Sequence, residues 1–424
     1  MNSITVKPKI FQIEMPIVPK FGIHTLSNGT NIYLLEGGTQ PIVRVDMVFR
    51  AGSVFASKCG LARAVSVLVG EGVPNMNAEQ IAEKIDFYGA QIWQKSDTIN
   101  SVISFIVLDK HLNNILPLIE MMIKQPTFPE KEIGIYLDKE FQNFKINIGK
   151  SRYRSSYEFT RNFYAEGSRY GRVTTEDSIH KLTRDDMVNF HKLTYSPSSL
   201  NVFVSGRPSE QSMALIDNVF GGDWGSTEPI PEPEKPILRK WKSQIMQFDR
   251  PGSMQASITM GRHLPSLPHT DLMPLNVINT IFGGYFGSRL MQNIREEKGL
   301  TYGIGSNINI RRNNSLMRIV SDVEPNNWQL VVDEIFNEMH KLQTEPITAD
   351  ELEMVRNYMK GQILTRYDSI MSSVDTLVPY VLEQISLDYD KQMFSIIENI
   401  TSSEIQQLAQ KYLVPNEFKI IVVK

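Results

Sequence analysis

The chain contains an internal repeat, and this repeat restricts the folds that it can adopt. Residues 182–206 and 400–423 each show the pattern of a capped helix, a tyrosine, a proline and a strand. Pro197 and Pro415 occupy equivalent places, 218 positions apart (415 − 197). The two segments are LTRDDMVNFHKLTYSPSSLNVFVSG and ITSSEIQQLAQKYLVPNEFKIIVV. Such agreement indicates a duplicated structural unit.

The helix starts of the two copies also agree. Thr183 is followed three residues later by Asp186, and Thr401 by Glu404, which is the pattern of a capping box. The register continues upstream, where PTFPEKEIGIYLDKEF aligns with EPITADELEMVRNYMK at a spacing of 219 positions. The chain is therefore predicted to be a tandem duplication.

A proline-rich stretch separates the two copies. The segment GDWGSTEPIPEPEKPILRK favours an extended, semi-rigid linker. We therefore predict a first half at residues 1–225, a linker at 226–240 and a second half at 241–424. The linker prolines are Pro229, Pro231, Pro233 and Pro236.

Each half mixes strand and helix patterns. In residues 43–49 apolar positions alternate, which predicts a half-buried strand, and Asn28-Gly29 predicts a hairpin turn before it. In the second half, residues 256–260 alternate similarly, and a helix near 275–282 runs into GGYFGSR. A hairpin at IRRNNSLMRIVSDV and a helix at 328–342 follow. The predicted fold class is α+β, with two homologous sandwich domains that enclose a chamber.

Composition excludes several classes of function. The 424 residues carry 44 Lys and Arg against 47 Asp and Glu, so the chain lacks the basic excess expected of a nucleic-acid-binding protein. No run approaches the length of about 20 apolar residues that spans a membrane. The first residues lack a secretory signal pattern, and the lone Cys59 suits a reducing compartment, so we expect a cytoplasmic protein.

The stretch CGLARAVSVLVGEG, from residue 59 to residue 72, is typical of an amphipathic helix. Its apolar residues Leu61, Val65 and Leu68 recur at i, i+4 and i+7. Arg63, Ser66 and Val67 share a neighbouring face. Arginine, serine and valine do not bind metal, so this face carries no ligand set.

These features resemble the pitrilysin-like (inverzincin) zinc peptidases over nearly the whole chain, in the short two-half form found in mitochondrial processing peptidase subunits. In that family the opening helix carries H-x-x-E-H, whose histidines bind zinc while the glutamate activates water. The matching positions here are residues 63–67, where Arg63, Ser66 and Val67 replace both histidines and the general base. The resemblance therefore implies a member that binds no zinc.

No substitute zinc site is indicated by the sequence. None of the seven histidines forms an i, i+4 pair. Glu140, in YLDKEF, lies roughly where the family places its third zinc ligand, but alone it is better interpreted as a surface glutamate, and we assign it no metal role. Arg63 is interpreted as extending its stem along the core to solvent. No cofactor is expected on this chain.

The second half retains more of the family pattern. The segment FGGYFGSRLMQNIREEKGLTYGIGS resembles the one that supplies an arginine and a tyrosine, seven residues apart, to a substrate held at zinc. Arg295 and Tyr302 match this spacing. The resemblance implies that the arginine anchors a peptide carbonyl and that the tyrosine stabilises the oxyanion.

Simpler interpretations of these residues exist. IREEK also suits a solvated helix end, and Tyr302 suits a half-buried strand position. The glycines of GGYFG lack the Lys-Ser/Thr ending of a phosphate loop, so a helix end and a tight turn are predicted there.

The resemblance implies several functions of different classes. In the preferred one, the chain is the zinc-lacking subunit of a heterodimeric peptidase, and a homologous partner with an intact H-x-x-E-H supplies zinc and hydrolyses unstructured peptides. The alternatives are an inactive assembly scaffold, and a stand-alone peptide binder in which a sheet edge pairs with an extended peptide. The retained Arg295 and Tyr302 favour the first, because a scaffold has no chemical need of them.

Overall fold

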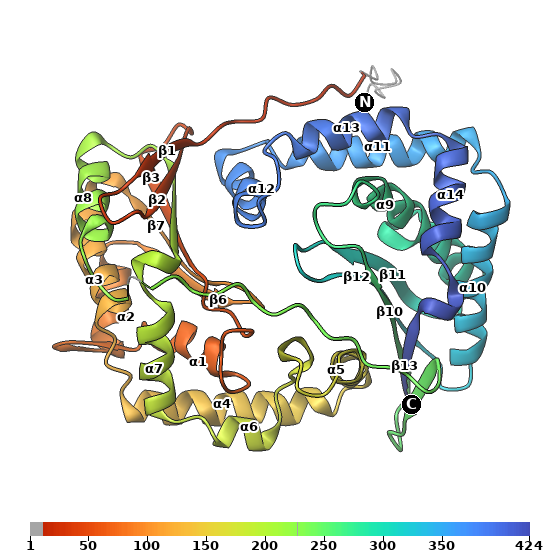
Figure 1. The fold of residues 1–424 in the computed structure, drawn as a ribbon, viewed down its shortest axis with the longest axis horizontal. Helices are drawn as coiled ribbons and strands as arrows, with labels where there is room; N and C mark the ends of the chain where they lie inside the picture. The colour runs from red at the N-terminus through yellow and green to blue at the C-terminus, as the bar shows by residue number, and fades with distance from the viewer. Residues whose placement is uncertain (1–11, 227) are drawn as a thin grey trace, which may run out of the picture.

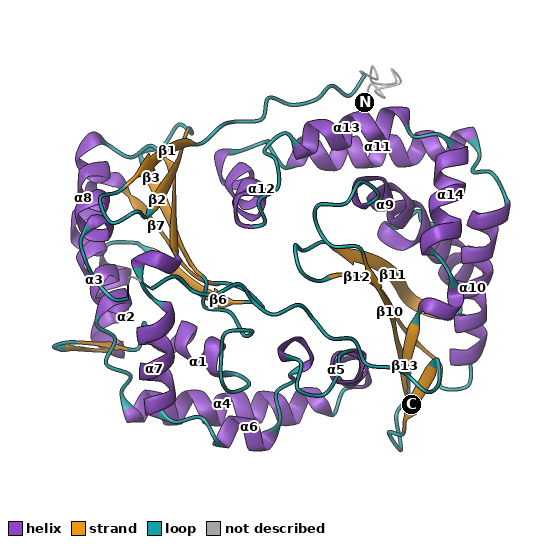
Figure 2. Ribbon diagram, in the orientation of Figure 1, coloured by secondary structure: helices purple, strands orange, loops and turns teal. Residues whose placement is uncertain are grey.

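The computed structural model describes residues 12–226 and 228–424. Each half of the chain forms one large mixed sheet, and the first half adds a small two-stranded one; the two large sheets lie on opposite sides of the molecule with most helices packed around the outside (Figure 1). Figure 2 shows the same arrangement by element type, with most strands on the inner side of the helices and one strand pair projecting outward at the left.

The elements of the first half alternate between strands and helices along the chain. They are β1 (Gly22–Thr25), β2 (Asn31–Glu36), β3 (Ile42–Phe49), α1 (Leu61–Leu68), β4 (Gly72–Val73), β5 (Met76–Asn77), α2 (Ala78–Phe87), β6 (Gln91–Ser96), β7 (Ser101–Leu108), α3 (Leu112–Lys124), α4 (Glu130–Ile148), α5 (Ser151–Phe163), α6 (Glu176–His180), α7 (Arg184–Thr194), β8 (Leu200–Gly206) and α8 (Glu210–Gly221). Short 3₁₀ turns lie at η1 (Asp109–His111), η2 (Arg169–Gly171) and η3 (Pro197–Ser199).

The second half follows a similar order. Its elements are β9 (Ile245–Phe248), β10 (Ala256–Leu264), α9 (Leu272–Asn279), the π-helical turns η4 (Thr280–Gly284) and η5 (Met291–Glu297), β11 (Thr301–Asn309), β12 (Ser315–Val323), α10 (Trp328–Thr344), α11 (Ala349–Thr365), α12 (Ile370–Leu382), α13 (Tyr389–Asn399), α14 (Ser402–Tyr412), the 3₁₀ turn η6 (Pro415–Glu417) and β13 (Lys419–Val423).

The two sheets share one topology, which confirms the predicted duplication. The strand order is β2-β8-β3-β7-β6 in the first sheet, with β1 added at the β2 edge, and β9-β13-β10-β12-β11 in the second. In both sheets the same pair is parallel, β2 with β8 and β9 with β13. Capping boxes form at Thr183 and Thr401, as predicted, and α4 and α11 begin 219 positions apart.

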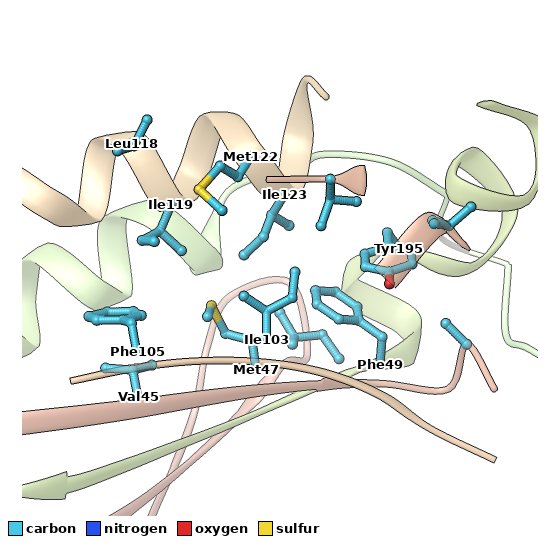
Figure 3. Packing of buried hydrophobic residues seen from close by; sticks show 14 of the residues in the cluster. Val45, Met47, Phe49, Ile103, Phe105, Leu118, Ile119, Met122, Ile123 and Tyr195 are labelled. Carbon is cyan, nitrogen blue, oxygen red and sulfur yellow. The ribbon is translucent and has the colours of Figure 1, made fainter. Parts of the chain in front are cut away.

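The core of the first half lies between its sheet and the outer helices. Figure 3 shows inward side chains of β3 and β7 opposite those of α3, with Tyr195 at one end of the cluster. Burial of each large apolar side chain contributes about 1.5–3 kcal/mol relative to exposure. The labelled residues are Val45, Met47, Phe49, Ile103, Phe105, Leu118, Ile119, Met122, Ile123 and Tyr195.

The prediction that β3 is half-buried is wrong at its end. Val48 points away from this core and is nevertheless buried, in a second cluster with Phe203 and side chains of α12. A helix from the other half of the chain therefore covers the inner face of this sheet. The predicted Asn28-Gly29 turn is present and joins β1 to β2, with Gly29 at φ 83°.

The two halves exchange one helix each. Helix α5 of the first half packs against β10 and β13 of the second sheet, where Phe159 and Phe163 contact Ile421 and Val423. Helix α12 of the second half packs against β8 and β2 of the first sheet. The two helices start 219 positions apart (370 − 151), so they are equivalent members of the repeat. The exchange joins the halves through apolar contacts as well as through the chain.

Two extended segments also connect the halves. Residues 228–240 run from the first half to the second beyond α8, while residue 227 of the predicted linker lies outside the described residues. Residues 12–21 cross elsewhere (Figure 1), with Ile13 against the core of the second half and Phe21 against the first sheet and α12. Across the described ranges, no helix is long and apolar enough to cross a membrane.

Candidate functional site

Helix α1 is the predicted opening helix. It begins after Gly60, whose φ of 83° is a left-handed conformation that glycine adopts without a steric penalty. Leu61, Val65 and Leu68 are buried, as the spacing predicts, and the helix packs against α7, β6 and β7. The apolar face of α1 is therefore packed against the core of the first half, and only its opposite face is available to other groups.

The three positions of the altered motif do not share one accessible face. The side chain of Arg63 is 65% exposed, whereas Ser66 is buried and Val67 is partly buried. The Ser66 hydroxyl has no hydrogen-bond partner among the described residues. Of the face that these three residues share, Ser66 is therefore closed to solvent and Arg63 is open to it.

Arg63 and Glu140 form an ion pair between α1 and α4. The Nη2 atom of Arg63 lies 3.1 Å from Oε1 of Glu140, and the glutamate side chain is only 19% exposed. The exposure of Arg63 agrees with its interpretation as reaching solvent, whereas the interpretation of Glu140 as an isolated surface glutamate is wrong, because its carboxylate is partly buried and paired. Burial raises the pKa of the neighbouring Tyr136 phenol, and the Glu140 carboxylate raises it further. The Arg63 guanidinium is the cation that pairs with the Glu140 carboxylate.

The described residues, 12–226 and 228–424, contain no group of three or more His, Cys, Asp or Glu side chains placed to hold a metal ion. Glu140 is occupied by Arg63, and the neighbouring positions 66 and 67 carry no ligand. The residues at the altered motif therefore do not fit zinc.

The equivalent helix of the second half ends differently. Helix α9 continues into the π-helical turn η4, which ends at Gly283 and Gly284, so the predicted helix end and tight turn are present. A Cβ at Gly283 would lie 2.6 Å from Oγ of Ser306, so only glycine allows this close approach to β11. The second π-helical turn, η5, carries Arg295, and wide turns of this type are frequent at functional sites.

Arg295 and Tyr302 line the same cleft, whose volume is about 1150 Å³. The Arg295 guanidinium lies over the Phe286 ring, 4.9 Å from its centroid, and its side chain is 35% exposed. Tyr302, at the start of edge strand β11, is 89% exposed. The interpretation of Tyr302 as a half-buried strand residue is therefore wrong. Its phenol is free to contact another molecule.

Helix α5 connects this cleft to the altered motif. Arg152 lines the cleft and pairs with Asp322 of β12 at 2.8 Å. Burial raises the pKa of the Tyr153 phenol, which follows Arg152 in the chain. The charge of Arg63 lowers this pKa and the charge of Glu140 raises it, so Tyr153 lies near the altered motif. The sequence did not single out Arg152. The basic pattern KSRYR at the start of α5 was a weak signal for it, because nothing local shows that this helix crosses to the second sheet.

Comparisons with known proteins agree with this architecture. Residues 181–359 match the family described as the Peptidase M16 inactive domain. The chain is 23% identical over 365 residues to an uncharacterized zinc protease of Bacillus subtilis, covering 83% of this chain and 85% of that protein.

Two solved structures have the same fold over almost their full lengths. A structure described as a peptidase M16 inactive domain from Pseudomonas fluorescens superposes with a TM-score of 0.86 at 19% identity, covering 95% of this chain and 98% of the other. A protease from Helicobacter pylori also gives 0.86 at 18% identity, covering 96% and 100%. The chain is therefore similar in fold to M16-type proteins over nearly its whole length, and its residues 181–359 are similar in sequence to the family described as the Peptidase M16 inactive domain.

Proposed function

We propose that this chain is the zinc-lacking subunit of a two-subunit peptidase, and that Arg295 and Tyr302 contact a peptide held on a homologous partner. The observation that carries the proposal is the contrast between the two sites. Arg63 neutralises Glu140 at the altered motif, while Arg295 and Tyr302 line an open cleft. The zinc expected in the partner would activate water, and this chain would bind and orient the peptide.

Each residue has a chemical role in this proposal. The Arg295 guanidinium donates charge-assisted hydrogen bonds to a peptide carbonyl, and its stacking on Phe286 holds the planar group in place. The Tyr302 hydroxyl donates to the oxyanion that forms during hydrolysis. Both roles need exposed side chains, and Tyr302 is 89% exposed. We also propose a cytoplasmic location, because the lone Cys59 suits a reducing compartment.

The first test measures metal in the purified chain by elemental analysis. The wild type should hold far less than one zinc per chain. The variant Arg63→His/Val67→His places two imidazoles at i, i+4 beside Glu140 and should bind about one zinc, because these three side chains form a typical ligand set. The matched control Arg63→Ala/Val67→Ala should bind none. One tightly held zinc in the wild type would contradict the proposal.

The second test mixes this chain with a homologue of similar length that carries an intact H-x-x-E-H, sought first in a neighbouring reading frame. Cleavage of an unstructured, dye-labelled peptide should require both chains and should stop when a chelator is added. Chelator-sensitive cleavage by this chain alone would contradict the subunit role. Partner turnover that is unaffected by this chain would favour the scaffold or peptide-binding alternatives.

A further inference from the structure

A second cavity adjoins the cleft of Arg295 and Tyr302. It has a volume of about 710 Å³, within the range of ligand sites, and it shares Arg152 and Asp322 with that cleft. Helix α5 forms one wall, and the edge strand β11 and its neighbour β12 contribute Gly303, Gly305 and Arg318. We name this cavity the Arg318 trough.

Arg318 lies in the trough without an acidic partner. Its guanidinium is partly buried and forms no ion pair with any described residue, and its Nε atom is buried with no hydrogen-bond partner among those residues. Its contacts are a 2.8 Å hydrogen bond from Nη2 to Oγ of Ser156 and a stacking contact with Phe159, 5.1 Å from the ring centroid. A buried charge that lacks a counterion is costly, so a ligand carboxylate here would relieve a cost that the folded chain carries.

A purely structural role for Arg318 explains less. The bond to Ser156 and the stacking on Phe159 do attach β12 to α5. A neutral side chain could make these contacts without the desolvation of a cation. By contrast, the neighbouring Arg152 already pairs with Asp322, which also accepts a hydrogen bond from Ser257. At this wall of the trough, Arg152 has an acidic partner, whereas Arg318 has none among the described residues.

The glycines leave space for a ligand beside this charge. A Cβ at Gly303 would meet nothing within 4 Å, so the absence of a side chain there opens the trough. Asn307 is exposed and lies directly opposite Arg318 in the β11–β12 pairing, where its amide can donate to the same carboxylate. The trough and the adjoining cleft are together lined by five basic and three acidic side chains, although the whole chain has a formal net charge of −3. The basic residues are Lys150, Arg152, Arg250, Arg295 and Arg318.

We propose that the Arg318 trough binds a glutamate or aspartate side chain of an extended peptide. This inference rests on the proposed peptide role and adds a preference for acidic substrates. Tyr302 and Asn307 are five residues apart on β11, and a strand rises about 3.3 Å per residue. A peptide that contacts Tyr302 and runs along β11 should therefore place its acidic residue about four to six residues from the bond held at Tyr302.

The test measures binding by this chain alone, without a partner or zinc. The probes are dye-labelled, neutral 12-residue peptides in which one glutamate is moved through every position, each with a glutamine twin. In fluorescence anisotropy, the best glutamate peptide should bind at least about ten-fold tighter than its twin, the difference expected from one charge-assisted hydrogen bond. The preference should be confined to a narrow range of positions.

Variants separate this site from general charge effects. Arg318→Gln should reduce the glutamate-to-glutamine ratio to near one, while Arg161→Gln, an exposed arginine on α5, should leave it unchanged. Gly303→Val should weaken both twins together, because it fills the trough without removing the charge. Circular dichroism and thermal melting confirm folding, and Arg318→Lys, which retains the charge, should keep part of the preference.

Two results would overturn the inference. A wild-type ratio near one at every position, including a complete absence of binding, contradicts an acidic subsite. A preference that persists in Arg318→Gln places the subsite elsewhere. Neither result affects the two-chain cleavage assay, which tests the subunit role separately.

Discussion

The two halves share a strand order but differ where each opening helix meets its surroundings. In the first half, α1 stays a regular helix and its Arg63 is joined to Glu140. In the second half, α9 widens into π-helical turns, and the chain that follows presents Arg295 and Tyr302 to an open cleft. At the equivalent place, the same fold therefore holds an ion pair in one copy and an open cleft lined by Arg295 and Tyr302 in the other.

The exchanged helices differ in how they are held. Helix α5 is attached through hydroxyl contacts such as Ser155 to Thr259 at 2.9 Å and through Arg318. The segment around α12 is fixed by Asp390, which is fully buried and lies between Arg366, Tyr367 and Tyr380. The Asp390 network therefore holds α12 within the second half, while apolar contacts and the Arg44–Asp375 ion pair join α12 to the first sheet.

Asp390→Asn should cause the largest loss of stability. The Asp390 carboxylate accepts hydrogen bonds from Tyr367 at 2.6 Å and Tyr380 at 2.9 Å and pairs with Arg366. Removal of the charge leaves the guanidinium uncompensated, which should lower the free energy of unfolding by about 3–5 kcal/mol in urea titration. The exposed control Asp388→Asn should change it by less than about 0.5 kcal/mol. Equal effects of the two substitutions would show that the network does not hold α12.

Acid should destabilise the first half before the second. His191 is buried and its Nε2–H donates to Ile123 O, 2.8 Å away, and burial lowers its pKa from 6.5 to about 4. The equivalent position in the second half is Ala409 (409 − 191 = 218). Because the unfolded imidazole binds a proton first, stability is fully present above pH 6.5 and is lost as the pH falls towards 4, by about 3 kcal/mol in total.

Urea unfolding between pH 7 and pH 4 measures this loss, and hydrogen exchange shows which half opens. His191→Ala, which copies the second half, should flatten the pH dependence even though its cavity lowers stability at pH 7. A slope that is unchanged by this substitution would show that another group causes the acid sensitivity.

The ion pair of the altered motif should contribute the least. The Arg63 side chain is 65% exposed, so its pair with Glu140 is screened by water, and pairs of this kind contribute about 0.2–1 kcal/mol. A double-mutant cycle of Arg63→Ala and Glu140→Ala should give a coupling energy in that range. A coupling above about 2 kcal/mol would show that the pair replaces a metal as a structural link between α1 and α4.

The sequence predicted the duplication, because Thr183 and Thr401 and their flanking patterns are local signals that recur in register. It also predicted α1 and the β11–β12 hairpin. It did not predict the exchanged helices, since the period of apolar residues shows that α5 has an apolar face but not which sheet covers it. The Arg63–Glu140 pair was missed for the same reason, because the two residues are 77 positions apart (140 − 63) and only tertiary structure joins them.

The burial of Ser66 and the exposure of Tyr302 were also outside the reach of the sequence pattern. A serine on a helix and a tyrosine in a strand are each compatible with both environments. The packing of α1 against α7 decides the first, and the edge position of β11 decides the second.

The central claim is that the second half of this chain supplies Arg295 and Tyr302 to a reaction on a partner. The most direct measurement is peptide turnover by this chain mixed with its zinc-bearing homologue, comparing wild type with Arg295→Ala and Tyr302→Phe at equal assembly, as checked by chromatography. Each variant should keep its fold, and loss of the Tyr302 oxyanion donor should lower turnover by about 10²–10³-fold. Undiminished turnover in both variants would contradict the account.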